Sequence, residues 1–312
     1  MADSTHPKVV WVDGKLVPWN DATIHITNLG TSGVSSVFEG IRAYWNAAQK
    51  KLYVFQLDAH LERFEQSMRL LRMKQAFSAA QLKQGVLELL RENEYADDTY
   101  IRPFAFVESP TFGAAANMEA RIVLSTQKWP STLKSSKVVN ACVSSWTRNN
   151  DNSMPPRIKA SSNYLNSRYA SEEARRNGYD LAIFLNSNGK VSEAPGATLI
   201  LVRKGKVIAP SVTSNILESI TREMLLQLFR DELKTPVIER EVDRTELYVA
   251  DEAFVCGTGA EVVPIRSVDG RTIGDGTIGA RTERIIQAYA ELVRSTGTPI
   301  ASKTGIAASV SG

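Results

Sequence analysis

Lys159 is the residue whose surroundings best suit covalent chemistry. It stands in MPPRIKASSNYLNS, between a proline-stiffened loop and the start of a predicted helix. A lysine with restricted freedom in a partly desolvated cleft forms a Schiff base with an aldehyde readily. Tyr164 follows five residues later, in the first turn of that helix, where its hydroxyl can bond a phenolate oxygen. Taken singly, a solvated loop lysine and an aromatic core residue are the simpler interpretations.

Glu193 is the second candidate, in KVSEAPGATL, where we expect it at the end of a short strand before a Pro-Gly bend. A buried carboxylate beside a pyridine nitrogen keeps that ring protonated, which makes the ring an electron sink. A surface carboxylate in a hairpin is the competing interpretation.

A phosphate group would need a set of convergent donors. In SNILESITREM, Ser219 is the predicted N-cap of a helix, and Ile220 and Thr221 follow with N–H groups that the helix leaves unpaired. Gly257-Thr258-Gly259 permits close backbone approach to an anion, and Arg63 can add a charged fork. Simple helix capping explains the first segment equally well. Together with Lys159 and Glu193, these segments predict a site for a phosphorylated aldehyde cofactor.

The elements that must position these residues follow from turn signals and apolar periodicity. Asp13-Gly14 predicts a hairpin, and Asp58 is the predicted cap of a helix with apolar positions at helical spacing. Two strands are expected within 8–19, and further strands at 37–45, 52–56, 99–107, 120–126, 138–146, 180–186, 190–193, 197–210 and 252–256. The expected helices lie at 58–71, 79–92, 162–177, 219–233 and 279–296.

Length and alternating element types predict two α/β (α+β) domains. At 312 residues the chain exceeds what one core usually organises. We expect a small N-terminal domain at 1–130, a connection at 131–138, a larger domain at 139–297 and a mobile tail at 298–312.

Composition excludes several classes of protein. The 37 basic and 34 acidic residues are interspersed and leave a net charge of +3, which argues against nucleic-acid binding. The sequence contains no apolar stretch long enough to span a bilayer and no secretory signal, so we expect a cytoplasmic protein. Cys142 and Cys256 are expected as reduced thiols. His6, His25 and His60 lack ligand spacing, so no metal is expected.

Seven motifs together resemble one family. HLERF, VFEGIRAY, YIRP, the Lys159 segment with NYL, SEAPG, ITRE and CGTGAEVVPIRSVDG stand in the order and at about the intervals of the branched-chain amino acid aminotransferases, which are fold type IV pyridoxal-phosphate enzymes. The resemblance covers roughly residues 8–290.

The resemblance implies a role for each matching position. Lys159 is implied to bind pyridoxal 5′-phosphate covalently and to move the proton at the substrate Cα. Tyr164 is implied to contact the ring hydroxyl, Glu193 the ring nitrogen, and Arg63, Ile220, Thr221 and Thr258 the phosphate. The implied substrate pocket comprises Phe38, Tyr100, Arg102, Trp129, Gly259 and Ala260. Arg102 is the candidate for binding a distal carboxylate, with a structural pair to Glu108 or another carboxylate as the alternative.

The resemblance also implies an architecture and partners. The larger domain is expected to carry a barrel-like sheet, and the cofactor to lie between the domains. Family members are homodimers or larger, and their substrates are amino acids and 2-oxo acids. The implied reaction is a ping-pong exchange between an L-amino acid, with leucine, isoleucine and valine favoured, and 2-oxoglutarate.

Four departures from the family pattern concern the pocket and the phosphate site. Gly33 stands where a tyrosine is usual, Thr198 where asparagine is usual, and Glu218-Ser219 where Pro-Gly is usual. PSTLKS after Trp129 also lacks a common tyrosine. Two missing tyrosines predict a wider pocket, and Glu218 would oppose a phosphate unless it points away or pairs with Arg222.

Alternative functions remain open from the sequence. One is a class IV transaminase for a bulkier amino acid, a D-amino acid or an (R)-amine, or a lyase of the same fold. YIRP and GTGAE favour the L-specific branch. Another is a non-catalytic cofactor-binding protein, which would not need Lys159, Tyr164 and Glu193 together.

Overall fold

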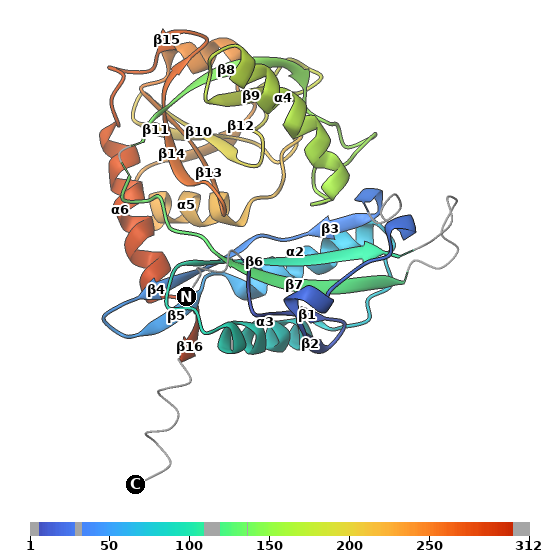
Figure 1. Ribbon diagram of the computed structural model, residues 1–312. Helices are drawn as coiled ribbons and strands as arrows, with labels where there is room; N and C mark the ends of the chain where they lie inside the picture. The colour runs from blue at the N-terminus through green and yellow to red at the C-terminus, as the bar shows by residue number, and fades with distance from the viewer. Residues whose placement is uncertain (1–5, 29–32, 109–118, 136, 302–312) are drawn as a thin grey trace. The chain divides into compact units, whose positions relative to one another are not determined.

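The computed structural model describes residues 6–28, 33–108, 119–135 and 137–301. The chain divides into two compact units. The first comprises residues 1–131, 158–162 and 292–312, and the second comprises 132–157 and 163–291. Each unit contains one eight-stranded sheet with helices, which agrees with the predicted mixed α/β class (Figure 1).

The first unit is built on a sheet of strand order β16-β5-β4-β6-β7-β1-β2, with β3 paired to β6. All of its pairings are antiparallel. Its strands are β1 (Val9–Val12), β2 (Lys15–Pro18), β3 (Ser36–Phe38), β4 (Ile41–Asn46), β5 (Lys51–Val54), β6 (Thr99–Val107), β7 (Ala120–Lys128) and β16 (Thr298–Ala301). The expected single run at 37–45 is thus two strands, interrupted at Glu39-Gly40.

The hairpin predicted at Asp13-Gly14 is confirmed. Val12 pairs with Lys15, and the two turn residues have φ values of 46° and 92°. Both positive values belong to the turn whose twist matches that of the flanking strands.

Two helices cover one face of this sheet. They are α2 (Leu57–Leu70) and α3 (Ala79–Asn93), and their apolar positions share one buried core with the strands. Ser78 and Gln81 form a capping box at the start of α3. The predicted cap at Asp58 is wrong: the N-cap of α2 is Gln56, in the left-handed conformation at φ 52°, and Asp58 pairs with Lys83 instead.

The other face of the sheet is more exposed. Along β6, Ile101 and Ala105 belong to the helix-covered core and Pro103 is also buried. The alternate side chains of Tyr100, Arg102 and Phe104 are only partly buried or exposed. We call this second face the outer face. Because side chains alternate along a strand, these residues share one surface.

The second unit has the strand order β12-β11-β10-β13-β14-β8-β9, with β15 paired to β14. Its sheet mixes parallel and antiparallel pairs and curls into a partial barrel (Figure 1). Its strands are β8 (Val139–Thr147), β9 (Leu181–Leu185), β10 (Thr198–Arg203), β11 (Lys206–Pro210), β12 (Val237–Arg240), β13 (Glu252–Gly257), β14 (Glu261–Val268) and β15 (Arg271–Thr272).

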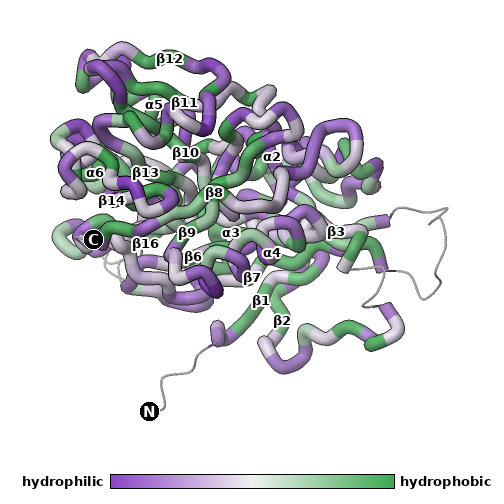
Figure 2. Tube along the Cα trace, turned by 90° about the horizontal axis from the view of Figure 1, so that it is seen from above, coloured by the Kyte–Doolittle hydropathy of each residue, from purple (hydrophilic) through white to green (hydrophobic). Residues whose placement is uncertain are grey.

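Helices α4 (Tyr164–Arg176) and α5 (Ile220–Asp231) pack on this sheet, and α6 (Ala280–Ser295) begins in the second unit and ends in the first. Ala170 and Ala174 of α4 share a buried cluster with Phe184 of β9. Hydrophobic stretches follow the strands in both sheets, and the turns are more hydrophilic (Figure 2). Cys142 and Cys256 are free and buried, and burial raises the pKa of the Cys256 thiol to about 12.

Three expectations differ from the structure. Residues 158–162, predicted inside the larger domain, belong to the first unit. Thr298–Ala301, predicted as mobile tail, form β16 and pair with β5, while residues 302–312 lie outside the described part. Residues 190–193 form no regular strand, because Lys190 and Val191 make only isolated bridges. Within the described residues, no helix is both long and apolar enough to cross a bilayer.

Candidate active site

The backbone of Lys159 is fixed on both sides within the first unit. Its carbonyl accepts a hydrogen bond of 3.0 Å from the Phe38 N–H, and its own N–H donates to Ser67 Oγ at 3.2 Å. Ala160 forms a bridge with Val37, and Ile158 and Ala160 are buried in the core of this unit. The lysine is therefore anchored between β3 and α2, although it lies in a segment without regular structure. The sequence predicted neither the hydrogen bond to Ser67 nor the bridge between Ala160 and Val37.

The Phe38 ring lies beside two cations. Lys159 Nζ is 4.8 Å from the ring centre, and Arg102 Cζ is 5.1 Å from it. The predicted alternative for Arg102, a pair with Glu108, is not formed: Glu108 accepts from Arg121 at 2.9 Å and from Asn28 at 2.7 Å. Lys159 and Arg102 thus both lie against the Phe38 ring.

Tyr100 and Trp129 form an aromatic pair in the same unit. Their ring centroids are 5.2 Å apart, and Trp129 is 40% exposed. The buried Arg42 donates Nη2 hydrogen bonds to the carbonyls of Trp129 and Pro130 at 2.8 and 3.0 Å. A Cβ at Gly40 would lie 1.8 Å from Tyr100 Oη, so only glycine allows the tyrosine its position. Arg42 and Gly40 are supports that single-sequence reasoning did not identify.

Arg63 lies in a buried ionic cluster. Its Nε and Nη2 donate to the two oxygens of Glu39 at 2.7 and 2.9 Å, and His60 Nδ1 is 2.8 Å from Glu39 Oε2. Burial would raise the pKa of Glu39, but the Arg63 charge and the His60 hydrogen bond outweigh it and hold that pKa far below its usual range. Burial also lowers the pKa of His60, so neutral His60 donates its Nδ1 proton to the carboxylate. The cluster orients Arg63.

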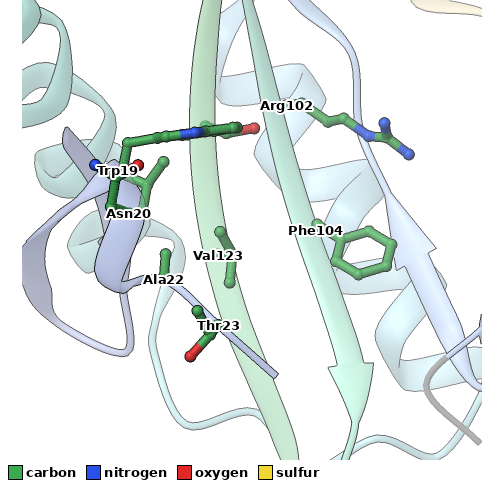
Figure 3. A pocket seen from close by; sticks show the side chains of 9 residues that line it. Trp19, Asn20, Ala22, Thr23, Arg102, Phe104 and Val123 are labelled. Carbon is green, nitrogen blue, oxygen red and sulfur yellow. The ribbon is translucent and has the colours of Figure 1, made fainter. Parts of the chain in front are cut away.

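A cavity of about 550 Å³ lies on the outer face (Figure 3). Arg102 and Phe104 of β6 border it, and Trp19 and Thr23 of the segment after β2 lie across β7 from them. Its lining is mainly apolar with a few polar side chains, and Val10, Asn20, Ala22, Val123 and Ser125 complete it.

The second unit contains the expected anion-binding helix end. Ser219 caps α5 as predicted, since its Oγ accepts from the Arg222 N–H at 3.2 Å. The helix supplies no partner for the N–H groups of Ile220 and Thr221. Thr221 Oγ1 lies 3.4 Å from Thr258 Oγ1, which joins this helix end to the glycine turn.

Tight packing joins that turn to the bend after Glu193. A Cβ at Gly257 would lie 3.1 Å from the Gly196 carbonyl oxygen, and one at Gly196 would lie 3.9 Å from Tyr164. In contrast, a Cβ at Gly259 would meet no atom of the described residues within 4 Å, so the turn Gly259-Ala260 borders open space. Tyr164 is the first residue of α4, as predicted.

Glu193 is only 4% exposed, and residues of the second unit contact both of its carboxylate oxygens. Arg148 Nε and Nη2 each lie 2.8 Å from its Oε1, and the Leu217 N–H donates to its Oε2 at 3.2 Å. The interpretation as a surface carboxylate is therefore wrong. Arg148 was missed because 45 residues separate it from Glu193.

The departures from the family pattern are accommodated locally. Glu218 pairs with Arg157 at 2.7 Å, and Arg222, the predicted partner, pairs with Glu239 at 2.8 Å. Thr198 is buried at the start of β10. A Cβ at Gly33 would find nothing within 4 Å in the described structure, so the missing tyrosine leaves space.

The predicted residues fall into two sets. The first unit holds Phe38, Arg63, Tyr100, Arg102, Trp129 and Lys159, and the second holds Tyr164, Glu193, Ile220, Thr221, Thr258, Gly259 and Ala260. In the first set, Arg102 and Lys159 both contact Phe38, whereas Tyr100 and Trp129 form a separate pair and Arg63 is placed by its own cluster on α2.

Comparison with known proteins shows the family to which the chain belongs. Residues 36–268 match the family model described as amino-transferase class IV. The chain is 41% identical over 283 residues to a probable branched-chain-amino-acid aminotransferase of Aquifex aeolicus, an alignment covering 90% of this chain and 91% of the relative.

The chain is also similar to solved structures. The branched-chain amino acid aminotransferase of Thermobaculum terrenum in its PLP form has a TM-score of 0.92 and 44% identity, with 95% of this chain and 99% of that chain covered. The T.th. branched-chain amino acid aminotransferase complexed with N-(5′-phosphopyridoxyl)-L-glutamate has a TM-score of 0.86 and 35% identity, with 92% and 94% covered. With a family model across most of its length and relatives of this identity, the chain belongs to the class IV amino-transferases.

Proposed function

We propose that this protein is a pyridoxal-phosphate-dependent transaminase that exchanges the amino group between an L-amino acid and 2-oxoglutarate by a ping-pong mechanism. Leucine, isoleucine and valine are the favoured donors. Class IV aminotransferases use pyridoxal phosphate, and the relatives above are named for branched-chain substrates. The observation that carries the proposal is Lys159, whose backbone is bonded on both sides and whose ammonium lies over Phe38.

The donor set of the second unit fits the cofactor. The capped end of α5 and the hydroxyls of Thr221 and Thr258 suit a phosphate, which gains from the helix dipole and from unpaired N–H groups. The open space beside Gly259 gives room for an anion. The buried Glu193 carboxylate, held by Arg148, suits a protonated ring nitrogen. Ile220, Thr221, Thr258 and Arg63 would hold the phosphate, Glu193 the ring nitrogen and Tyr164 the ring hydroxyl.

Lys159 has two tasks in this proposal. Its Nζ would hold the cofactor covalently, and the same amine would remove the proton from the substrate Cα and later return it. When bound, pyridoxal phosphate supplies the electron sink that makes this proton acidic. Tyr164 follows Lys159 by only five residues, so their Cα atoms cannot be more than about 17 Å apart.

The outer face of the first unit suits both substrates of the exchange. Phe38, Tyr100 and Trp129 offer apolar surface for a branched side chain, and Arg102 offers a guanidinium for the distal carboxylate of glutamate. Gly259 and Ala260 of the second unit are also proposed to bind the substrate. The open position at Gly33 favours tolerance of bulky side chains.

A homodimer or larger homo-oligomer, in which a loop of one subunit closes the partner's pocket, is part of the proposal. It is supported by the resemblance of the chain to its family. A cytoplasmic location remains a prediction from the sequence.

The covalent role is tested by absorption spectroscopy. Purified protein with pyridoxal phosphate should show the visible band of the bound cofactor, and Lys159→Ala should lose it. Lys206→Ala, which removes an exposed lysine at the start of β11, is the matched control and should keep the band. A colourless wild-type protein would end the proposal.

The substrate is tested by half-reactions. L-leucine, L-isoleucine and L-valine should each convert the cofactor to its amine form, and 2-oxoglutarate should reverse the change with release of glutamate. D-leucine and (R)-amines test the alternative specificity in the same assay. Failure of all three branched-chain amino acids, with success of another amine, would reassign the substrate and keep the chemistry. Colour without any half-reaction would favour the non-catalytic alternative.

A further inference from the structure

Arg148 is a buried cation without a role in the proposed reaction. It follows the last residue of β8, and its N–H donates to the Leu185 carbonyl at 2.9 Å. Its side chain is 7% exposed and places both Nε and Nη2 at 2.8 Å from one oxygen of Glu193. Such a charged fork is both stronger and more directional than a neutral hydrogen bond.

The fork itself is held by two further elements. Nη1 of Arg148 donates to Asn166 Oδ1 on α4 at 3.2 Å, and Asn166 in turn donates to the Thr147 carbonyl at 3.0 Å. The guanidinium lies 5.6 Å from the ring centre of Phe184, a fully buried residue of β9. Contacts with Asn166 on α4 and Phe184 on β9 thus hold the Arg148 guanidinium in place, and the guanidinium in turn holds the Glu193 carboxylate.

This arrangement has a consequence for a ring nitrogen beside Glu193. A buried carboxylate without a partner takes up a proton, whereas an opposite charge within hydrogen-bond distance favours the ionised form. An ionised carboxylate accepts a hydrogen bond from a protonated pyridine and keeps the proton on the ring. A protonated carboxyl group would donate to a neutral ring instead and would weaken the electron sink.

We propose that Arg148 is a positioning residue that holds Glu193 ionised and in a fixed orientation toward the ring nitrogen of pyridoxal phosphate. This inference rests on the proposed function, in which Glu193 contacts that nitrogen. Arg148 would influence the reaction through Glu193, without itself touching the substrate.

The test compares the binding of pyridoxal phosphate with that of its 1-deaza analogue, in which carbon replaces the ring nitrogen. Wild-type protein should prefer pyridoxal phosphate. Arg148→Met should reduce this preference by at least about tenfold, since a charge-assisted contact is lost. A merely structural role would weaken both ligands equally and leave the ratio unchanged, which would overturn the inference.

Two further variants keep the test decisive. If Arg148→Met does not fold, Arg148→Gln is measured, because its neutral amide keeps a polar side chain but removes the charge; a reduced ratio supports the proposal and an unchanged ratio refutes it. Arg240→Met removes the fork that Arg240 makes to the buried Glu246 in the same unit, so it controls for the loss of an ion pair, and its ratio should equal that of wild type.

The infrared spectrum of the protein without cofactor gives an independent readout. Arg148→Met should show the carbonyl stretch of a protonated carboxyl group that wild type lacks, and Arg148→Met combined with Glu193→Gln should lose it. No such band in Arg148→Met would count against the proposal. Wild-type protein that binds no pyridoxal phosphate would refute the proposed function instead, and a wild type without preference would refute the role of Glu193.

Discussion

Lys159 and Phe38 contact each other twice, once through the backbone and once through their side chains. The Phe38 N–H donates to the Lys159 carbonyl at 3.0 Å, and the Lys159 ammonium lies 4.8 Å from the centre of the Phe38 ring. The strand residue thus determines both where the lysine backbone lies and where its charged end is held.

Replacement of Phe38 should therefore impair catalysis more than folding. A cation–π contact is worth about 0.5–2 kcal/mol, so Phe38→Leu should lower kcat/KM by roughly 2- to 30-fold. Phe38→Tyr keeps the ring and should retain most activity. Steady-state kinetics with leucine, alongside thermal unfolding, checks this, and equal kcat/KM for Phe38→Leu and wild type would contradict it.

Gly40→Ala should displace Tyr100 and disturb the pocket wall. The new Cβ would lie 1.8 Å from Tyr100 Oη and 2.6 Å from Cζ. Such overpacking costs about 1–3 kcal/mol, and we expect a raised KM for the amino donor together with a lower unfolding temperature. Gly33→Ala, where the new methyl meets open space, should leave stability unchanged. A Gly40→Ala variant with wild-type KM would show that the position of Tyr100 is unimportant.

Stability should fall as the pH is lowered, through His60 and then Glu39. Both pKa values are lower in the folded protein than in an unfolded chain, so the unfolded state binds more protons. The contribution of these two groups to the free energy of unfolding is complete above about pH 6.5. Below that pH, His60 takes up a proton in the unfolded chain and part of the contribution is lost. Below about pH 4.3, Glu39 takes up a proton in the unfolded chain and the rest is lost. Urea unfolding across this range measures the slope.

Glu39→Gln isolates the carboxylate in that profile. Removing one partner of a buried ion pair costs about 3–5 kcal/mol, so the variant should be less stable at pH 7 and should show a shallower decline below about pH 4.3. Glu62→Gln, on the exposed side of the same helix, should follow the wild-type profile. If the stability of Glu39→Gln fell as steeply as that of wild type below about pH 4.3, Glu39 would not be the group responsible.

Arg102→Leu should separate the two proposed substrates. If the guanidinium binds the distal carboxylate, KM for glutamate should rise by about 10- to 100-fold and KM for leucine should change little. Arg121→Leu is the matched control, because Arg121 lies on the outer face but pairs with Asp13 and Glu108. Equal effects of Arg102→Leu on both substrates would indicate a structural role.

The sequence by itself determined the features that depend on neighbouring residues. The Asp13-Gly14 turn, the Ser219 cap and the positions of Tyr164 and Thr221 at helix starts follow from local backbone preferences, which a few adjacent residues express. The order and spacing of seven motifs predicted the family. The Asp58 cap failed because Gln56 adopts a left-handed conformation that begins the helix earlier.

Only the tertiary structure decided which distant residues meet. Arg148 pairs with Glu193 across 45 residues, Arg63 with Glu39 across 24, and Ser67 holds Lys159 across 92. Residues 158–162 joined the first unit for the same reason: Val37 and Ser67 supply the partners for their backbone. A buried charge or N–H group is stable only with a partner, and that partner is chosen by packing in space, which sequence spacing does not encode.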